Sequence, residues 1–336
     1  MSFCRRAFQC IEIHQDGSIC VCCPAWNKFY MLGNIFNGSF EDAWNSEKAV
    51  ELRKRILNND YSLCDVKNCP AIASGDFNSF THYETKGYTP VMMEYPKEVK
   101  FCYDAECNIV CEMCRDSLFL NSDEQLKKYD EMIDTTFLPL LKNAELVTIN
   151  AQGDPFASRH SRKLISAIVK NYPNIMFEFH TNASTCTPEI LEELGVVDRI
   201  KIMRVSLHAA SAKTYGLIVK NGEKIFPKTI KNLEYIKKLR EQYKVPFEFY
   251  NQFVIMAKNY KDMPAFVDMN DKLGATSVFW EYLSNIGHSE NKQVDLKSVH
   301  LKEHPKHKDF LKYLKHPNMY KGCHLSPLIR NLQNNG

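Results

Sequence analysis

The chain has 336 residues, of which 44% are hydrophobic and 25% charged, a balance typical of a globular protein of one or two domains. Its formal net charge is only +3, so the composition gives no electrostatic reason to expect a nucleic-acid partner. No apolar run approaches the length of a membrane span, and we expect no membrane partner.

Thirteen cysteines are the unusual part of the composition. Residues 1–6 have no apolar stretch around their two arginines, so they lack the pattern of a secretory signal. Cysteines in a chain without an export signal favour metal binding over disulfides. We therefore expect a protein of the reducing cytoplasm with metal-bound thiolates.

Seven of the cysteines fall within residues 4–70. An Asp-Gly pair at 16–17 lies between two β-branched runs, which predicts a hairpin. This hairpin would bring Cys10 beside Cys20, Cys22 and Cys23. The region therefore begins with a group of thiols gathered by one turn.

The same region continues with a helix that starts near Ser39 and carries Trp44, and it closes with Cys64 and Cys69. Four cysteines from the hairpin and the closing segment suit either an iron–sulfur cluster or a tetrahedral zinc ion, because thiolates alone do not discriminate between them. The cysteine array that follows in the chain makes iron–sulfur the favoured interpretation.

That array is Cys107, Cys111 and Cys114, directly after a strand predicted over 99–103. Three thiolates in a C-x3-C-x2-C spacing can hold three irons of a [4Fe–4S] cube and leave the fourth iron without a protein ligand. Zinc more often takes pairs of C-x2-C, and a fourth nearby ligand is missing here. An open iron is a position where a small molecule can coordinate.

From residue 99 onward, strand-like and helix-like segments alternate, which predicts βα units and a parallel sheet. Ser122 with Gln125 forms a capping box at one helix start, and Thr187 caps a short helix that ends at Gly195. Six strands suit a partial (β/α)6 barrel, and an open doubly wound sheet is the alternative. We expect the other strands at 146–149, 175–179, 200–206, 247–255 and 276–282, and helices near 158–171, 226–243 and 261–273.

The array and its place after a first strand resemble those of the radical S-adenosylmethionine (SAM) enzymes, over most of residues 97–290. The resemblance implies a TIM-like partial (β/α)6 barrel. It makes Cys107, Cys111 and Cys114 the ligands of the catalytic cluster. SAM would chelate the open iron, and one electron would cleave it to a 5′-deoxyadenosyl radical. The resemblance also implies a reductant such as flavodoxin or ferredoxin.

Gln152, Gly153, Asp154 and Pro155 follow the second predicted strand, where the family carries Gly-Gly-Glu-Pro. Glycine allows close approach to a ligand, and a carboxylate answers the SAM ammonium group. This sequence has Gln for the first Gly and Asp for Glu, so the acid is kept. The alternative interpretation is a β-turn, because Gly-Asp-Pro forms turns in many contexts.

Other positions resemble SAM contacts of the family. Ser206 and Asn182, at the ends of the fourth and third strands, would face the ribose hydroxyls or the methionyl carboxylate, and Met113 would contact adenine. Asn251 and Gln252 are open candidates for substrate contact. His208 is either a proton carrier or, as we favour, a structural histidine.

Residues 8–72 resemble the SPASM/twitch auxiliary-cluster module of radical SAM enzymes. The match rests on the Gly-x4-Cys spacing from Gly17 to Cys22, on Leu-Gly-Asn-Ile at 32–35, and on Trp-Asn-Ser at 44–46 ahead of an arginine-bearing helix. The module normally follows the barrel, and this chain lacks the cysteines for two auxiliary clusters. The resemblance implies one auxiliary [4Fe–4S] cluster held by Cys10, Cys22, Cys64 and Cys69, with Cys23 as the main rival for Cys22 and Cys20 as a lesser one.

The remaining cysteines, Cys4, Cys102 and Cys186, have the character of ordinary buried thiols, and a ligand role for Cys323 is disfavoured. We expect an auxiliary module over 1–90, a barrel over 91–290 and a peripheral helix and tail over 291–336.

The expected function is that of a radical SAM oxidoreductase or maturase acting on a sugar-like or other small polar molecule. A ribosomally made peptide is the alternative substrate, and the lack of an appended peptide-recognition module favours the small molecule. A non-catalytic iron–sulfur protein for electron transfer or assembly is the alternative of another class. Transfer RNA modification would call for a basic face that this balanced composition does not reveal.

Overall fold

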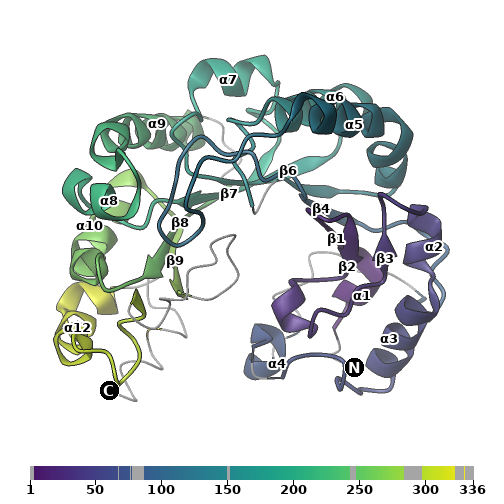
Figure 1. The fold of residues 1–336 in the computed structure, drawn as a ribbon, viewed down its shortest axis with the longest axis horizontal. Helices are drawn as coiled ribbons and strands as arrows, with labels where there is room; N and C mark the ends of the chain where they lie inside the picture. The colour runs from purple at the N-terminus through teal and green to yellow at the C-terminus, as the bar shows by residue number, and fades with distance from the viewer. Residues whose placement is uncertain are drawn as a thin grey trace. The chain divides into compact units, whose positions relative to one another are not determined.

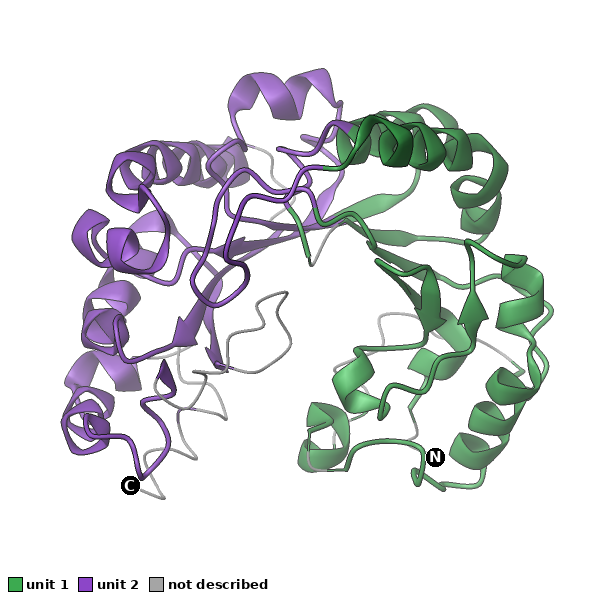
Figure 2. Ribbon diagram, viewed as in Figure 1, with its two compact units in different colours: residues 1–105, 121–153, 160–177 green, residues 106–120, 154–159, 178–336 purple. Residues whose placement is uncertain are grey.

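The computed structural model describes residues 4–66, 68–75, 77, 87–149, 152–242, 247–283, 297–321 and 329. The protein is a mixed α/β chain that divides into two compact units (Figure 2). Unit 1 comprises residues 1–105, 121–153 and 160–177, and unit 2 comprises residues 106–120, 154–159 and 178–336. Among the described residues, no helix is both long and apolar enough to cross a membrane.

The strands of unit 1 combine an antiparallel hairpin with parallel pairing (Figure 1). Their order is β3-β2-β1-β4-β5. The β1–β2 and β2–β3 pairs are antiparallel, whereas β1–β4 and β4–β5 are parallel. The hairpin predicted at residues 16–17 is thus confirmed. The strands are β1 (Cys10–His14), β2 (Ser18–Cys20), β3 (Gly33–Asn34), β4 (Glu98–Cys102) and β5 (Leu146–Ile149), and β6 (Met176–Thr181) runs from unit 1 into unit 2.

Two helices of unit 1 begin where capping residues predict. Ser39 accepts a hydrogen bond from the Asp42 backbone N–H at 3.0 Å, and Ser122 accepts one from that of Gln125 at 3.1 Å. The helices are α1 (Arg6–Gln9), α2 (Phe40–Trp44), α3 (Glu47–Leu57), α4 (Pro70–Ser74), α5 (Asp123–Met132), and α6 (Arg159–Asn171), which starts at the last residue of a unit 2 segment; a π-turn covers Ile133–Phe137, and 3₁₀ turns cover Pro24–Trp26 and Pro139–Leu141.

Arg53 on α3 ties the N-terminal helices to the segment that leads into β4. Its side chain is fully buried, and its guanidinium lies 4.1 Å from the centre of the Trp44 ring. Nε donates to the Ala7 carbonyl at 2.8 Å, and Nη1 donates to Asn45 Oδ1 at 3.2 Å. The Asn45 amide in turn donates to the Met92 carbonyl. This network explains why Trp-Asn precedes an arginine-bearing helix.

Unit 2 contains the parallel strands β7, β8 and β9, with helices on one of their faces (Figure 1). The predicted strands and helices of this unit are present, with ends shifted by up to four residues, and α8 is an additional short helix. The elements are α7 (Pro188–Glu193), β7 (Ile200–Ser206), α8 (Ala212–Ile218), α9 (Gly222–Gln242), β8 (Glu248–Ile255), α10 (Met263–Leu273), β9 (Ser277–Tyr282) and α12 (His307–Leu314), with 3₁₀ turns at Tyr260–Asp262 and Pro317–Tyr320.

Side chains alternate between the two faces of β8. Asn251 is buried and donates to Asn270 Oδ1 of α10 at 2.8 Å. Its neighbour Gln252 is only half-buried and points to the other face, toward Ser206 and Glu281. Of the two candidates for substrate contact, Asn251 therefore serves strand–helix packing, and only Gln252 lies on the open face.

Candidate metal centres

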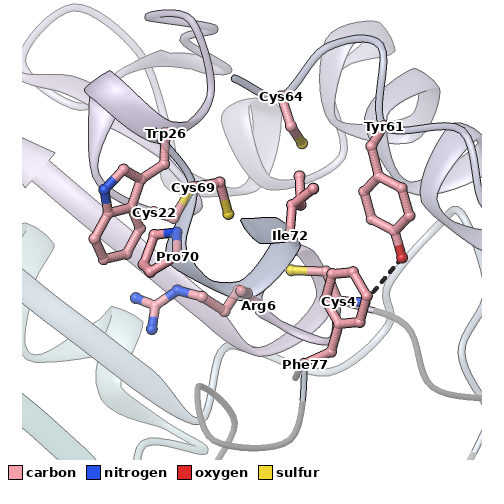
Figure 3. A pocket seen from close by; sticks show the side chains of 11 residues that line it. Cys4, Arg6, Cys22, Trp26, Tyr61, Cys64, Cys69, Pro70, Ile72 and Phe77 are labelled. Atoms are coloured by element: carbon pink, nitrogen blue, oxygen red, sulfur yellow. Dashed lines mark hydrogen bonds between the residues drawn. The ribbon is translucent and has the colours of Figure 1, made fainter. Parts of the chain in front are cut away.

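A small cavity in unit 1 is lined by four cysteines and by mainly apolar side chains (Figure 3). The cysteines come from three separate stretches: the N-terminal segment, the end of the hairpin, and the segment after α3. Trp26, Tyr61 and Phe77 supply aromatic walls. The four cysteines are Cys4, Cys22, Cys64 and Cys69.

Short backbone contacts bring these stretches together. The Asp65 N–H donates to the Trp26 carbonyl at 2.8 Å, and the Cys69 N–H donates to the Asp65 carbonyl at 2.8 Å. The Cys4 N–H donates to the Tyr61 hydroxyl at 3.4 Å (Figure 3). The cysteines thus face one cavity because the loop between them is fixed to the hairpin end.

The electrostatics of this cavity fit a cationic or iron–sulfur occupant. Burial, with nearby Cys4 and Cys69, raises the pKa of Cys64 to about 12. Burial also raises the pKa of Cys22, and the positive charge of Arg6 offsets part of this rise. The four cysteines are half-buried, and their thiolates would repel one another in one cavity, so a bound metal or cluster would stabilise them in that form.

The cavity agrees with three of the four auxiliary ligands expected from the sequence. Cys22, Cys64 and Cys69 line it, but among the described residues its fourth cysteine is Cys4 and not Cys10. Cys10 instead accepts a hydrogen bond from Arg6 Nη2 at 3.2 Å. The one-turn helix α1 between the two cysteines turns the chain, so they face different surroundings.

The rival ligands are also placed. Cys20 contacts His14 Nε2 at 3.1 Å and donates to the Cys22 carbonyl. Cys23 does not belong to the described lining of the cavity. All twelve cysteines in the described part of the chain are free thiols, and Cys323 lies outside that part.

The second group of cysteines lies in unit 2, on the loop that follows β4. Cys111 and Cys114 share a turn in which the Cys114 N–H donates to the Cys111 carbonyl at 2.9 Å. The loop is fixed to the α8–α9 connection, because the Glu112 N–H donates to the Ile218 carbonyl and the Lys220 N–H donates to the Val110 carbonyl. The array is therefore held in place by backbone pairing.

Asn182, at the end of β6, reaches the first cysteine of this array. Its amide lies 3.8 Å from Cys107 Sγ and donates to Asn108 Oδ1 at 3.0 Å. The Asn108 amide donates to Ser184 Oγ at 2.8 Å, which closes a small network. Burial raises the pKa of Cys107 to about 11, and the charge of Asp154 adds to that effect.

Asp154 is fully buried and is surrounded by donors. Oδ2 accepts from the Thr181 hydroxyl and the Asn182 N–H, both at 2.8 Å, and the Asp154 N–H donates to the Glu106 carbonyl at 2.9 Å. Oδ1 accepts from the backbone N–H of Phe156 and Ala157 and from the Thr185 hydroxyl. The sequence led us to expect that this acid meets the SAM ammonium group, whereas in the structure its carboxylate accepts from five donors of the protein.

The other predicted SAM contacts are partly or fully buried. Gln152, Gly153 and Met113 are half-buried, whereas Pro155 is buried. Ser206 is half-buried and donates to Gln252 Oε1 at 3.2 Å.

His208 is buried, and its Nδ1 accepts from the Val254 N–H at 3.1 Å. Burial lowers its pKa to about 4. These facts agree with the structural role that we favour.

The face of β7–β9 opposite the helices carries polar side chains. Arg204 donates to Glu178, and its guanidinium lies between the rings of Tyr250 and Phe279, 5.2 and 5.4 Å from their centres. Gln252 donates to Glu281. Burial raises the pKa of Glu281, although the Gln252 contact and Arg204 lower it. This face offers hydrogen-bond donors and acceptors, including the carboxylates of Glu178 and Glu281.

Comparison with known proteins bears on the N-terminal region. Residues 4–70 match the family model described as SPASM, an iron–sulfur cluster-binding domain. The SPASM module predicted in front of the parallel strands is therefore confirmed, and the match begins at Cys4. The matched segment contains all four cysteines of the cavity described above, so residues 4–70 form an iron–sulfur cluster-binding module of the SPASM type.

No curated protein sequence matches the chain significantly. Solved structures similar to it include Streptococcus suis SuiB bound to S-adenosylmethionine, with 14% identity, a TM-score of 0.40, and coverage of 58% of this chain and 42% of that one. The anSMEcpe structure with bound AdoMet has 18% identity, a TM-score of 0.43, and coverage of 65% and 56%. TYW1 with a lysine–pyruvate adduct has 14% identity, a TM-score of 0.38, and coverage of 62% and 68%. The chain thus spans less than two thirds of the SuiB and anSMEcpe chains, and likenesses of this level do not identify an activity.

Proposed function

We propose that this protein is a radical SAM enzyme whose catalytic [4Fe–4S] cluster is held by Cys107, Cys111 and Cys114 in a partial (β/α)6 barrel. When bound, the cluster supplies the electron that cleaves SAM to the radical that abstracts hydrogen from the substrate. The observation that carries the proposal is the three-cysteine loop, which neighbouring loops of unit 2 hold on both sides.

The residues around this loop position it. Asn182 directs its amide at Cys107 Sγ, and a hydrogen bond to a ligand sulfur is one way in which a protein sets the potential of a cluster. Asp154 holds the backbone of Asn182, so we assign it to shaping the site rather than to the ammonium group. The SAM contacts that we propose are Gln152, Gly153 and Pro155, with Met113 and Ser206.

We assign the auxiliary cluster to Cys4, Cys22, Cys64 and Cys69, because these four line one apolar cavity. Their role is to fix the auxiliary iron and to keep water from it. Arg6, at the same cavity, offsets part of the negative charge that four thiolates bring.

The substrate that we propose is a small polar molecule. The open face of β7–β9 supports this class, because Arg204, Gln252 and Glu281 offer hydrogen-bonding groups rather than an apolar surface. Glu281 is the candidate proton acceptor, since burial raises the pKa of its carboxyl group. A ribosomally made peptide is the second candidate.

Anaerobic reconstitution with iron and sulfide tests the two cluster assignments. Wild-type protein should hold about eight irons in two cubes. Replacing Cys107, Cys111 and Cys114 together with alanine should leave about four irons and abolish 5′-deoxyadenosine formation from SAM. Unchanged deoxyadenosine in this triple variant would refute the radical SAM assignment.

The choice between Cys4 and Cys10 is tested in the same assay. Cys4→Ser should lose the auxiliary iron, and Cys10→Ser, the matched control on the neighbouring strand, should keep it. If instead Cys10→Ser lost the auxiliary iron and Cys4→Ser kept it, Cys10 would be the fourth ligand. If wild-type protein held about four irons and zinc, the cavity would be a zinc site and not an iron–sulfur site. The assignment of the catalytic cluster to Cys107, Cys111 and Cys114 would be unaffected.

A further inference from the structure

Three side chains of the β1–β2 hairpin meet on one face of the sheet, outside the four-cysteine cavity. Glu12 and His14 lie two residues apart on β1 and so point to the same side. Cys20 on β2 lies opposite Glu12 in the antiparallel register. One potential ligand atom from each of the three lies within 4.8 Å of the others.

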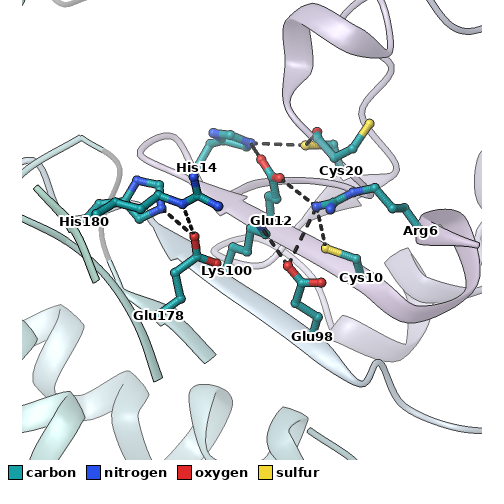
Figure 4. Close-up of polar contacts among 11 residues, drawn as sticks. Arg6, Cys10, Glu12, His14, Cys20, Glu98, Lys100, Glu178 and His180 are labelled. Atoms are coloured by element: carbon teal, nitrogen blue, oxygen red, sulfur yellow. Dashed lines mark hydrogen bonds and ion pairs between the residues drawn. The ribbon is translucent and has the colours of Figure 1, made fainter. Parts of the chain in front are cut away.

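The individual distances are close to those of a coordination sphere (Figure 4). His14 Nε2 is 3.1 Å from Cys20 Sγ and 3.9 Å from Glu12 Oε2. A tetrahedral zinc with bonds of about 2.0–2.3 Å keeps its ligand atoms about 3.3–3.8 Å apart. Small side-chain shifts would therefore be enough to enclose an ion.

We propose that Glu12, His14 and Cys20 form a mononuclear zinc site with one coordination position left open. Oxygen, nitrogen and sulfur donors in this combination suit zinc, and three protein ligands with an open fourth position are the arrangement of catalytic zinc sites. The open position would take water or an oxygen of a polar ligand. This site is separate from both iron–sulfur centres and does not depend on the proposed function.

The surroundings orient the ligands. Arg6 Nη2 lies 3.5 Å from Glu12 Oε1, so this oxygen faces a guanidinium while Oε2 faces His14. On the next strand, Lys100 pairs with Glu98 at 3.1 Å. The carboxylate is thus held for one-oxygen coordination.

Cys20 is turned away from the auxiliary cavity. Its sulfur donates to the Cys22 carbonyl at 2.9 Å, and in the described part of the chain Cys22 rather than Cys20 lines that cavity. When zinc binds, the Cys20 thiol proton is released to solvent, and the contact with His14 is replaced by two bonds to the metal.

The test uses the full-length protein with its iron–sulfur clusters loaded anaerobically. Zinc is added in slight excess, unbound metal is removed by gel filtration, and the retained zinc is measured together with its X-ray absorption fine structure. The expected result is about one zinc per chain, with one sulfur and otherwise nitrogen and oxygen neighbours.

Variants identify the ligands. Cys20→Ser and His14→Gln should each weaken zinc affinity by at least about tenfold, since losing a ligand costs more than losing a group that only orients one. Cys186→Ser, which removes a fully buried thiol in unit 2, should bind zinc as the wild type does. Glu12→Gln removes only the charge of the carboxylate. Thermal unfolding of each variant shows whether a loss of zinc binding reflects a lost ligand or an unfolded protein.

A zinc with four sulfur neighbours would place the metal in the cavity of Cys4, Cys22, Cys64 and Cys69 and overturn the proposal. Retention of no zinc by the loaded wild type would also overturn it, as would unchanged affinity in the folded Cys20 and His14 variants. Deoxyadenosine formation, assayed in parallel, reports on the radical SAM assignment and not on this site.

Discussion

Asp154 is a single buried carboxylate that joins three loops of unit 2. It accepts from the end of β6 and from its own turn, while its backbone N–H donates to Glu106 at the start of the cysteine loop. Two carboxylate oxygens offer about four acceptor sites, and five donors surround them here. A carboxylate whose acceptor sites are all occupied fixes the positions of the surrounding loops rather than binding a ligand.

Asp154→Asn should therefore lower the free energy of unfolding by about 2–4 kcal/mol, because an amide NH2 group would face donors instead of accepting from them. Denaturant unfolding followed by circular dichroism measures this change. Asp198→Asn, at an exposed position of the same unit, should stay within about 0.5 kcal/mol of the wild type. Equal stability of the two variants would return Asp154 to a role in SAM binding alone.

His208 predicts a pH dependence of stability. Its pKa is lowered to about 4 by burial, so as the pH falls the unfolded chain takes up the proton first, near its ordinary value of about 6.5. The contribution of the neutral imidazole is complete above about pH 6.5 and is lost on acidification toward pH 4, by roughly 3 kcal/mol in all.

His208→Asn tests this dependence, because asparagine keeps an acceptor for the Val254 N–H and tolerates the positive φ of 58° but does not titrate. Its unfolding free energy should fall less between pH 7 and 4 than that of the wild type. Parallel pH profiles for the two proteins would contradict the assignment of this loss to His208.

At the scale of elements, the β1–β2 turn depends on one glycine. Gly17 has φ of +81°, and a Cβ atom there would lie 2.5 Å from the Phe36 ring. Gly75, which ends α4, also has a positive φ of +69°, but nothing lies within 4 Å of its Cβ position. The two glycines differ in crowding and not in the sign of φ.

Gly17→Ala should therefore lower the free energy of unfolding by more than Gly75→Ala does. The left-handed conformation alone costs about 1–2 kcal/mol in either variant, and overpacking at residue 17 adds about 1–3 kcal/mol. Thermal or denaturant unfolding measures both. If the two losses were the same, the contact with Phe36 would not limit the turn.

Local chemistry determined which elements the sequence could predict. Ser39, Ser122 and Thr187 mark helix starts because each side chain accepts from the backbone N–H three positions on. The single turn of α1 and the seven residues of α8 are too short for a periodic pattern, and both depend on tertiary contacts. Because the sequence does not predict α1, it groups Cys10 with Cys22, whereas in the described residues Cys4 lines the cavity with Cys22.

At the scale of the whole molecule, the two cysteine groups belong to different compact units. We therefore predict that Cys69→Ser spares 5′-deoxyadenosine formation but stops product formation, because the substrate radical loses its anchor or its electron acceptor. Chromatographic measurement of both compounds with the substrate tests this. Cys23→Ser, beside Cys22 but not in the described cavity lining, is the control. If Cys69→Ser formed as much product as the wild type, the N-terminal module would have only a structural role.

Part of the candidate site was predictable because it rests on spacing along the chain. The array Cys107, Cys111, Cys114 needs only one loop, and the Gly-x4-Cys spacing marks the hairpin. The burial of Asp154 and the meeting of Glu12, His14 and Cys20 depend instead on strand register and on which face each side chain takes. Those facts follow only from the folded chain.

The parallel pair β1–β4 joins Cys10 to Glu98, 88 residues apart in the chain. A nascent chain that emerges from the ribosome presents the hairpin long before its partner strand exists. Until then one edge of β1 is unpaired, and long-range pairing of this kind is slow and prone to aggregation. Yield in the cell should therefore be sensitive to translation speed between the hairpin and β4, so that pausing within this stretch favours degradation or inclusion bodies over the native protein.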